Sequence, residues 1–120
     1  MTPQQFRRLA LALPDAVEGA HHGHPDFRAH GRIFASIVPA WGQGMVRVPL
    51  AVQKKLVGRR GGAFVAANGA WGRAGATMVN LADAVVGEVR AALLEAWQFA
   101  AADAEKRAAK KPRAQRAPKR

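Results

Sequence analysis

The sequence lacks cysteine altogether and contains no long apolar run. Without cysteine there is no disulfide framework, no thiolate metal site and no cysteine nucleophile. No apolar stretch approaches the roughly 18 residues that a membrane-spanning helix requires. The absence of cysteine suits a reducing compartment, so we expect a cytoplasmic protein. Apolar residues make up 49% of the chain, but many are alanine, which predicts one small domain with a thin core.

Acidic residues are missing from the C-terminal segment 106–120, which carries eight lysines and arginines. The whole chain has a formal net charge of +11. Its eight acids all lie in residues 1–105, where eleven lysines and arginines leave +3, so the C-terminal segment contributes the other +8. A block of cations, alanine and proline has little to bury, which predicts a folded domain over 1–105 and a disordered basic tail over 106–120. The expected partner of such a tail is a polyanion, most plausibly nucleic acid.

Turn residues and apolar periodicity divide the domain into helices and strands. The expected elements, in chain order, are a helix over 2–13, strands over 27–30, 33–38 and 45–48, a helix over 50–57, strands over 63–66 and 74–81, and a helix over 82–103. Thr2 and Gln5 predict a capping box at the first helix. Residues 16–24 are expected to be extended or irregular, and Gly31-Arg32 to be a tight hairpin turn. Gly42-Gln43-Gly44 predicts the next turn.

Two apolar patterns indicate where the core lies. In the strand over 33–38, alternation places Ile33, Ala35 and Ile37 on one face and the intervening residues on the other. Both faces are rather apolar, which predicts a central strand. In the last helix, Trp97 falls on an apolar stripe and is expected in the core. The elements together define an α+β fold in α-β3-α-β2-α order, an antiparallel sheet packed by helices.

Three segments resemble the MmcQ/YjbR family over roughly residues 3–101. They are Gly23-His24-Pro25-Asp26-Phe27-Arg28 followed by Gly31-Arg32-Ile33-Phe34-Ala35, then Ala70-Trp71-Gly72-Arg73-Ala74-Gly75-Ala76-Thr77, then Leu94-Glu95-Ala96-Trp97. The resemblance implies a compact α+β domain of bacterial type with a paired-wing shape, a shape described as DNA-binding. Many members carry an aromatic residue or histidine near the strand at 75–77. This chain has Ala74 and Ala76 there, so we expect any small-molecule pocket at that place to be altered or absent.

A histidine cluster is the first candidate for chemistry. In an ideal strand His22, His24 and Asp26 would share a face and could form a facial metal triad. Gly23 and Pro25 argue against a regular strand, and the same run matches the family's structural hairpin. We therefore predict that the cluster is structural and that the protein holds no metal and no cofactor.

Catalytic motifs have weak support. Ser36 is the only serine and sits inside an apolar strand, not on a nucleophile elbow. The run Gly58-Arg59-Arg60-Gly61-Gly62 could cradle a phosphate, but no helix start with Lys-Ser/Thr follows it, which favours a flexible basic turn. Asp15 and Glu18 lie in a loop and do not make an acid/base pair without a cleft. We predict no enzymatic activity.

Trp71 is the best localised surface candidate. Between glycines on a turn, its indole could stack on a base while Arg73 neutralises a phosphate, or it could fold back into the core. A basic face of Arg47, Lys54, Lys55, Arg59, Arg60 and Arg73 is the second candidate.

The sequence thus predicts a monomeric, non-enzymatic protein that binds nucleic acid, most plausibly DNA, with little sequence preference, through the tail and the basic face. The alternative is a small-ligand or protein-interaction module that uses a groove between sheet and helix, with the tail as a solubilising extension. The residues predicted to contact nucleic acid are Arg47, Lys54, Lys55, Arg59, Arg60, Trp71, Arg73, Lys106, Arg107, Lys110, Lys111, Arg113, Arg116, Lys119 and Arg120.

Overall fold

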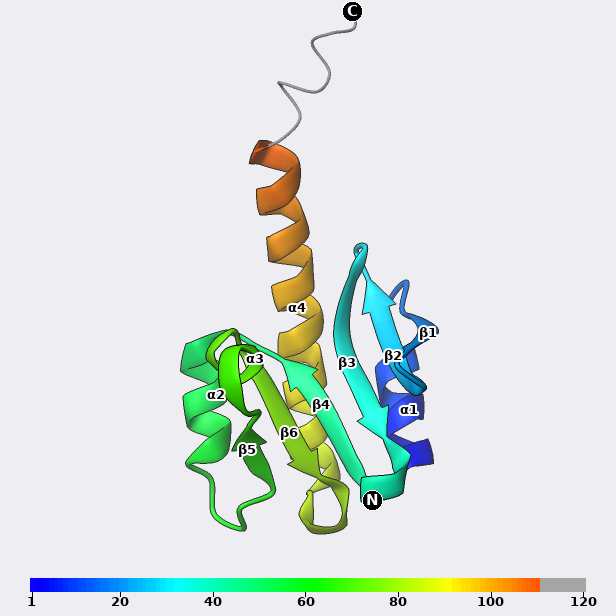
Figure 1. The fold of residues 1–120 in the computed structure, drawn as a ribbon, viewed down its shortest axis with the longest axis vertical. Coiled ribbons are helices and arrows are strands. Elements are labelled where there is room, and N and C mark those ends of the chain that lie inside the picture. The colour runs from blue at the N-terminus through cyan, green and yellow to red at the C-terminus, as the bar shows by residue number, and fades with distance from the viewer. Residues whose placement is uncertain (111–120) are drawn as a thin grey trace, which may run out of the picture.

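A computed structural model describes residues 1–110 and consists of one antiparallel sheet with the first and last helices behind one of its faces (Figure 1). Its elements are α1 (Pro3–Leu11), β1 (Val17–His21), β2 (His24–Ala29), β3 (Arg32–Val38), the 3-10 helix η1 (Pro39–Trp41), β4 (Gln43–Arg47), α2 (Leu50–Val57), β5 (Phe64–Ala66), α3 (Gly69–Arg73), β6 (Ala76–Asn80), the 3-10 helix η2 (Leu81–Asp83) and α4 (Val86–Lys110). The strand order is β1-β2-β3-β4-β6-β5, and every neighbouring pair is antiparallel. The predicted α+β class is confirmed.

Two tight turns build the first half of the sheet. His22-Gly23 joins β1 to β2 and His30-Gly31 joins β2 to β3, each with positive φ at both turn residues. That conformation matches the twist of the flanking strands. The second turn lies one residue earlier than the predicted Gly31-Arg32. The first turn creates β1, a strand absent from the predicted order, inside the segment 16–24 that was expected to be extended or irregular.

Helices α1 and α4 pack side by side behind the sheet (Figure 1). The predicted capping box is confirmed, because Thr2 Oγ1 accepts from Gln5 N at 3.1 Å and Gln5 Oε1 accepts from Thr2 N at 2.8 Å. Behind the sheet, Phe6, Phe27 and Phe34 are among the largest fully buried side chains. At Gly44 an added Cβ would fall 2.7 Å from the Phe6 ring, so a bare strand position lets α1 approach closely. This explains why Gly44 lies in β4 and not in the predicted turn.

Strand β3 is internal, as predicted, but its alternation is broken. Phe27 pairs with Ala35 while Arg28 pairs with Ile33, so the register shifts at Phe34. Phe34 and Ala35 both join the core, whereas Ile33 lines the uncovered face with Ser36. The predicted grouping of Ile33 with Ala35 and Ile37 is therefore wrong, because a bulge inserts one residue and reverses the side-chain direction beyond it.

The second half of the chain differs from the prediction at three places. Helix α2 has the predicted bounds, but 69–73 forms the short helix α3 instead of a plain turn. Helix α4 begins at Val86, after η2, and continues to Lys110. Lys106 and Arg107 are therefore helical and exposed, although the prediction placed them in a disordered tail. Alanine, lysine and arginine are strong helix formers, and an established helix propagates readily through such residues. The predicted tail residues 111–120 lie outside the described residues.

Trp97 was expected in the core; it packs against the core from its edge and is only half-buried. Its Nε1 donates to the Pro14 carbonyl oxygen at 2.9 Å. Its ring meets the His30 ring edge-on at a centroid distance of 4.7 Å. The indole therefore joins α4 to the loop after α1 and to the β2–β3 turn.

We expect Trp97→Ala to lower the free energy of unfolding by about 2 kcal/mol, less than the 3–5 kcal/mol typical of a fully buried tryptophan. The loss combines half-buried packing with one hydrogen bond. Urea denaturation followed by circular dichroism measures it. Trp41→Ala is the matched control, because that indole is 71% exposed and makes little packing to lose. An equal midpoint shift in the two variants would contradict this account of Trp97.

Within residues 1–110, no helix is long and apolar enough to cross a membrane.

Candidate functional site

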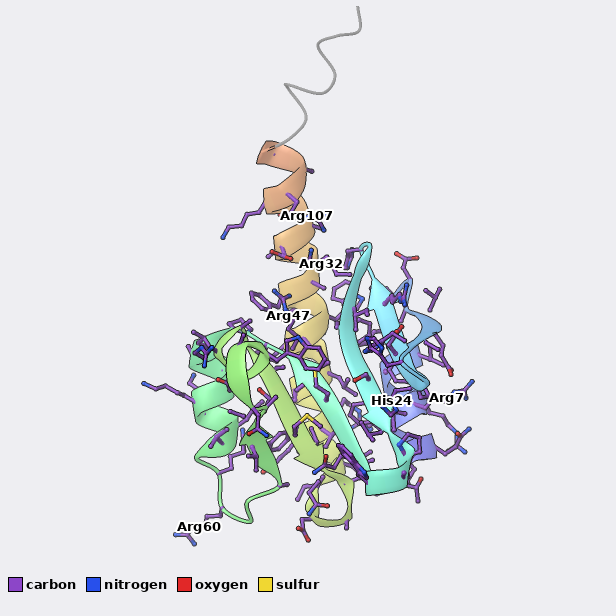
Figure 2. All side chains as sticks on the ribbon, viewed as in Figure 1. Arg7, His24, Arg32, Arg47, Arg60 and Arg107 are labelled. Atoms are coloured by element: carbon purple, nitrogen blue, oxygen red, sulfur yellow. The ribbon has the colours of Figure 1, made fainter. Side chains whose placement is uncertain are left out.

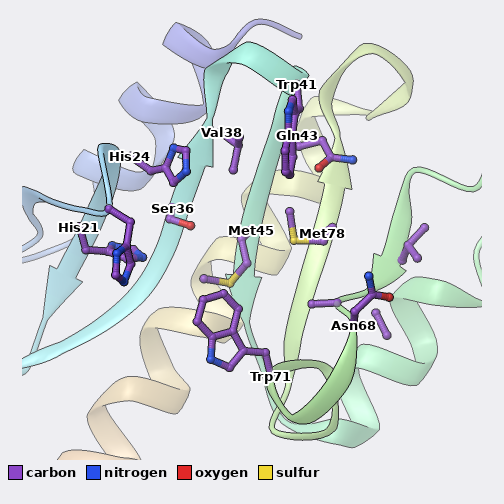
Figure 3. A pocket seen from close by; sticks show the side chains of 14 residues that line it. His21, His24, Ser36, Val38, Trp41, Gln43, Met45, Asn68, Trp71 and Met78 are labelled. Atoms are coloured by element: carbon purple, nitrogen blue, oxygen red, sulfur yellow. The ribbon is translucent and has the colours of Figure 1, made fainter.

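The face of the sheet opposite α1 and α4 carries a trough of about 600 Å³ (Figure 3). Its floor is formed by side chains of β3, β4, β6 and β5. These floor residues are Ser36, Val38, Gln43, Met45, Val65 and Met78. Trp71 stands near Met45 at one end and Trp41 stands at the other (Figure 3). The two indoles are 67% and 71% exposed, respectively.

Trp71 is held in place by the tight docking of α3. At Gly72 an added Cβ would fall 1.8 Å from the Ala67 carbonyl oxygen, so only glycine permits this approach. The buried Gln53 side chain of α2 donates from Nε2 to the Gly72 carbonyl oxygen at 2.9 Å and to the Ala76 carbonyl oxygen at 3.1 Å. Trp71 itself points away from the core. The alternative that placed Trp71 in the core is wrong, because the residue is 67% exposed.

A charged cluster on β1 and β2 lies next to the trough, which it reaches through His21. Asp26 is fully buried, and its carboxylate accepts from Arg28 Nε at 2.7 Å and Arg28 Nη2 at 3.0 Å. The His21 Nδ1 atom lies 2.7 Å from Asp26 Oδ2, the same oxygen that accepts from Arg28 Nη2. The Arg28 hydrogen bonds, with help from His21, hold the pKa of Asp26 below its usual value against the opposing effect of burial. The same carboxylate raises the pKa of Arg28, so both groups stay charged.

The predicted alternative of a metal triad does not form here. His22 sits in the β1–β2 turn at φ 49°, and the Asp26 oxygens are already engaged by Arg28 and His21. In the part of the chain that the structure describes, no group of three or more histidine, aspartate or glutamate residues is arranged to hold a metal ion.

A second hollow opens where β3 and β4 separate. Pairing between them starts at Ala35 and Val46, and beyond that point Arg28, Arg32 and Arg47 line a shallow cleft together with Gly31 and Ile33, called here the arginine cleft. Helix α4 supplies Asp103, whose carboxylate lies 2.9 Å from Arg32 Nη2 and 4.0 Å from Arg47 Nη1. The Arg47 guanidinium also lies over the Phe99 ring at 4.7 Å.

A small cavity of about 210 Å³ connects the two hollows. It shares Trp71 and Met45 with the trough, and Ile33 and Arg47 with the arginine cleft. Ala74 and Ala76 line it, so of the two expected outcomes, a pocket altered or absent at this place, the structure leaves a small pocket open. Ser36 faces this hollow too, but among residues 1–110 no hydrogen bond joins it to His21.

The predicted basic residues do not gather on one surface. Arg47 is engaged by α4, and Arg59 pairs with Glu88 at 3.1 Å. Lys54, Lys55, Arg60 and Arg73 are exposed, and within the described ranges they make no ion pair. Figure 2 shows Arg60 at the end of the molecule opposite Arg107, with Arg32 and Arg47 beside α4. Their role in nucleic-acid binding stays a prediction, and five of the predicted tail residues lie outside the described part of the chain.

Sequence reasoning did not assign Arg28 or Arg32 to the site, considered His21 only as part of the histidine cluster, and left the place of Trp41 open. Arg28 and Arg32 flank the β2–β3 turn, so their proximity to each other was available from the hairpin. Their proximity to Arg47 depends on the separation of β3 from β4, which no local pattern reports. The 3-10 helix that presents Trp41 ends at Gly42, which has a left-handed conformation with φ 62°. A glycine after a tryptophan is only a weak sequence signal for such a helix end.

No protein-family model, curated protein or solved structure matches this chain. The paired-wing, MmcQ/YjbR-like arrangement therefore stays an expectation drawn from the three sequence segments.

Proposed function

We propose that this chain is a non-enzymatic nucleic-acid-binding protein with little sequence preference. The observation that carries the proposal is the uncovered sheet face, on which two exposed indoles flank an apolar trough in a chain of net charge +11. Exposed aromatic rings stack on bases of any sequence, and clustered cations release counterions from phosphates. The sheet face supplies the aromatic rings, and the cations elsewhere on the chain supply the attraction to phosphates.

The distribution of cations supports the same proposal. Lys54, Lys55 and Arg73 are exposed on α2 and α3, and Lys106 and Arg107 are exposed on the last turns of α4. Six more lysines and arginines follow these two up to residue 120 without an intervening acid. No helix in the described chain has the helix-turn-helix setting that places side chains against base edges, which agrees with weak sequence preference. The resemblance to the MmcQ/YjbR family points to DNA as the first polymer to test.

The salt dependence of binding tests this proposal. Replacing all eight lysines and arginines of 106–120 by glutamine keeps the helix-forming character of α4 and removes the charge. If about half of the eight engage phosphates and the folded domain adds about two contacts, the slope of log affinity on log salt for duplex DNA should be about −5. The glutamine variant should retain a slope of about −2. Electrophoretic mobility titrations at several salt concentrations measure both slopes.

Arg7→Gln with Arg8→Gln is the control, because both residues belong to α1 behind the sheet and Arg7 already pairs with Glu18. This control should leave the slope nearly unchanged. Failure of the full chain to retard DNA at low salt would refute the proposal. An unchanged slope after neutralisation would assign binding to the folded domain alone.

A small-ligand module is the second candidate, and the trough itself favours it. Its volume of about 600 Å³ lies in the range of ligand pockets, and a lining of methionine and tryptophan is typical of them. The hollow lies on the open face of the sheet and not in the groove between sheet and helix that the sequence suggested. A compound that raises the melting temperature of the glutamine variant, in which the contribution of the basic segment to DNA binding is removed, would favour this candidate.

A further inference from the structure

The arginine cleft and the trough are two parts of one hollow with complementary chemistry. The small cavity between them shares Ile33 and Arg47 with the cleft, and Trp71 and Met45 with the trough. One part is apolar and aromatic, and the other is lined by three guanidinium groups. A ligand that fills both needs a planar apolar ring and an anion a short distance away.

The guanidinium groups keep donors for such an anion. Arg28 donates hydrogen bonds from Nε and Nη2 to Asp26, so three of its five N–H donors are not used by Asp26. Arg32 and Arg47 share the single carboxylate of Asp103. Three arginines against the two carboxylates Asp26 and Asp103 leave one net positive charge. The carboxylates and the Phe99 ring also fix the arginines in place, so little side-chain freedom is lost when an anion binds.

We propose that a single-stranded nucleic acid lies along this hollow, with a phosphate in the arginine cleft and the adjacent base against Trp71 over Met45. The inference rests on the proposed function and specifies its partner. A base can reach the floor of the trough only when it is unpaired, because the rings of a duplex are stacked inside it. The exposed Trp41 at the far end gives a second stacking surface for a neighbouring base. The overall charge of +11 favours a polymer of phosphates over a neutral aromatic ligand.

The proposal gives separate roles to Arg32, Arg47 and Trp71. Arg32 and Arg47 bind the phosphate, and Trp71 binds the base. Arg28 positions the cleft through Asp26 and contributes its remaining donors. Arg28 and Arg32 were not among the residues predicted to contact nucleic acid, and Arg47 contacts it inside the cleft and not on an open basic face.

Fluorescence anisotropy with a labelled twelve-nucleotide thymidine strand and a labelled duplex of equal length tests the assignment. In the full chain, Trp71→Ala should weaken binding of the single strand about tenfold, the effect of one stacked base, and change duplex affinity less than about twofold. Trp71→Phe should restore most of the loss. Arg32→Gln should weaken single-strand binding about tenfold and reduce its salt slope by about 0.7.

Arg60→Gln is the matched control for Arg32→Gln, because it removes the same charge at an exposed site far from the cleft (Figure 2). It should weaken single-strand binding less than about threefold, the effect of a distant exposed charge. Circular dichroism and melting curves confirm that each variant is folded; Trp71 and Arg60 are exposed, so these two variants keep the core intact.

Three results would overturn the inference while leaving the proposed function intact. They are equal losses for single strand and duplex in Trp71→Ala, equal losses in Arg32→Gln and Arg60→Gln, and full competition by thymidine monophosphate at the same nucleotide concentration. The last result would make the hollow a site for a free nucleotide. Absence of any nucleic-acid binding by the full chain would instead refute the proposed function itself.

Discussion

Gly75→Ala should lower the free energy of unfolding by about 4 kcal/mol, through backbone strain and a steric clash together. Gly75 has φ 108°, a conformation that L side chains rarely adopt, and an added Cβ would fall 2.1 Å from the Val48 carbonyl oxygen. The surrounding backbone has little room to yield, because the Gly75 carbonyl oxygen accepts from Val48 N at 3.1 Å and from Thr77 Oγ1 at 3.1 Å. Urea denaturation followed by circular dichroism measures the change.

Gly61→Ala separates the two causes. Gly61 has a similar φ of 94°, but nothing lies within 4 Å of the position that its Cβ would take. Only the backbone term should remain, a loss of about 1–2 kcal/mol. Similar losses in the two variants would contradict the close packing of Gly75 on Val48. Because Gly75 lies between α3 and β6, its replacement should also displace Trp71 and weaken single-strand binding.

Asp26→Asn should lower the free energy of unfolding by about 3 kcal/mol at neutral pH. The carboxylate is fully buried and accepts three hydrogen bonds, two from Arg28 and one from His21. An amide of the same shape offers one acceptor oxygen and places two hydrogens toward donors. Glu18→Gln is the control, since its pair with Arg7 is exposed and should be worth about 0.5 kcal/mol.

The pH dependence of stability gives Asp26 a second signature. Its folded-state pKa lies below the ordinary value, so its contribution is fully present above the unfolded pKa of about 4 and is lost as pH falls through the lower pKa of the folded state. Wild type should therefore lose more stability than Asp26→Asn on acidification below pH 4, and the two curves should converge. Parallel curves would show that the carboxyl group is not held ionised by Arg28 and His21.

Local signals gave reliable predictions wherever one residue and its near neighbours decide the structure. The Thr2–Gln5 capping box needs only the spacing of two residues, and α2 is bounded by Pro49 and Gly58. Strand β1 has no such signal, because it is an edge strand in which no residue is buried and no apolar side chain marks an inner face. Its existence depends on the turn at His22-Gly23, where histidine adopts the left-handed conformation more often taken by asparagine.

The elements of the site that escaped prediction all depend on tertiary contacts. Helix α3 contains two glycines and would not persist alone, but Gly72 docks on Ala67 and Gln53 binds its carbonyl group. The bulge at Phe34 sends Ile33 to the open face, and the separation of β3 from β4 brings Arg47 to Arg28 and Arg32. Trp71 was predicted as a candidate from its flanking glycines, and its exposure came from the docking of α3.

The strand order also determines which strand pairing costs the most chain entropy to form. Strands β1, β2, β3 and β4 each pair with their neighbour in the chain through short connections. Strand β6 instead pairs with β4 only after α2, β5 and α3 have intervened. Closing that long loop costs more entropy than any hairpin in the sheet, and long-range pairings of this kind slow folding. Met45 and Met78 are partners in this pairing. The floor of the trough thus depends on the most non-local contact of the sheet.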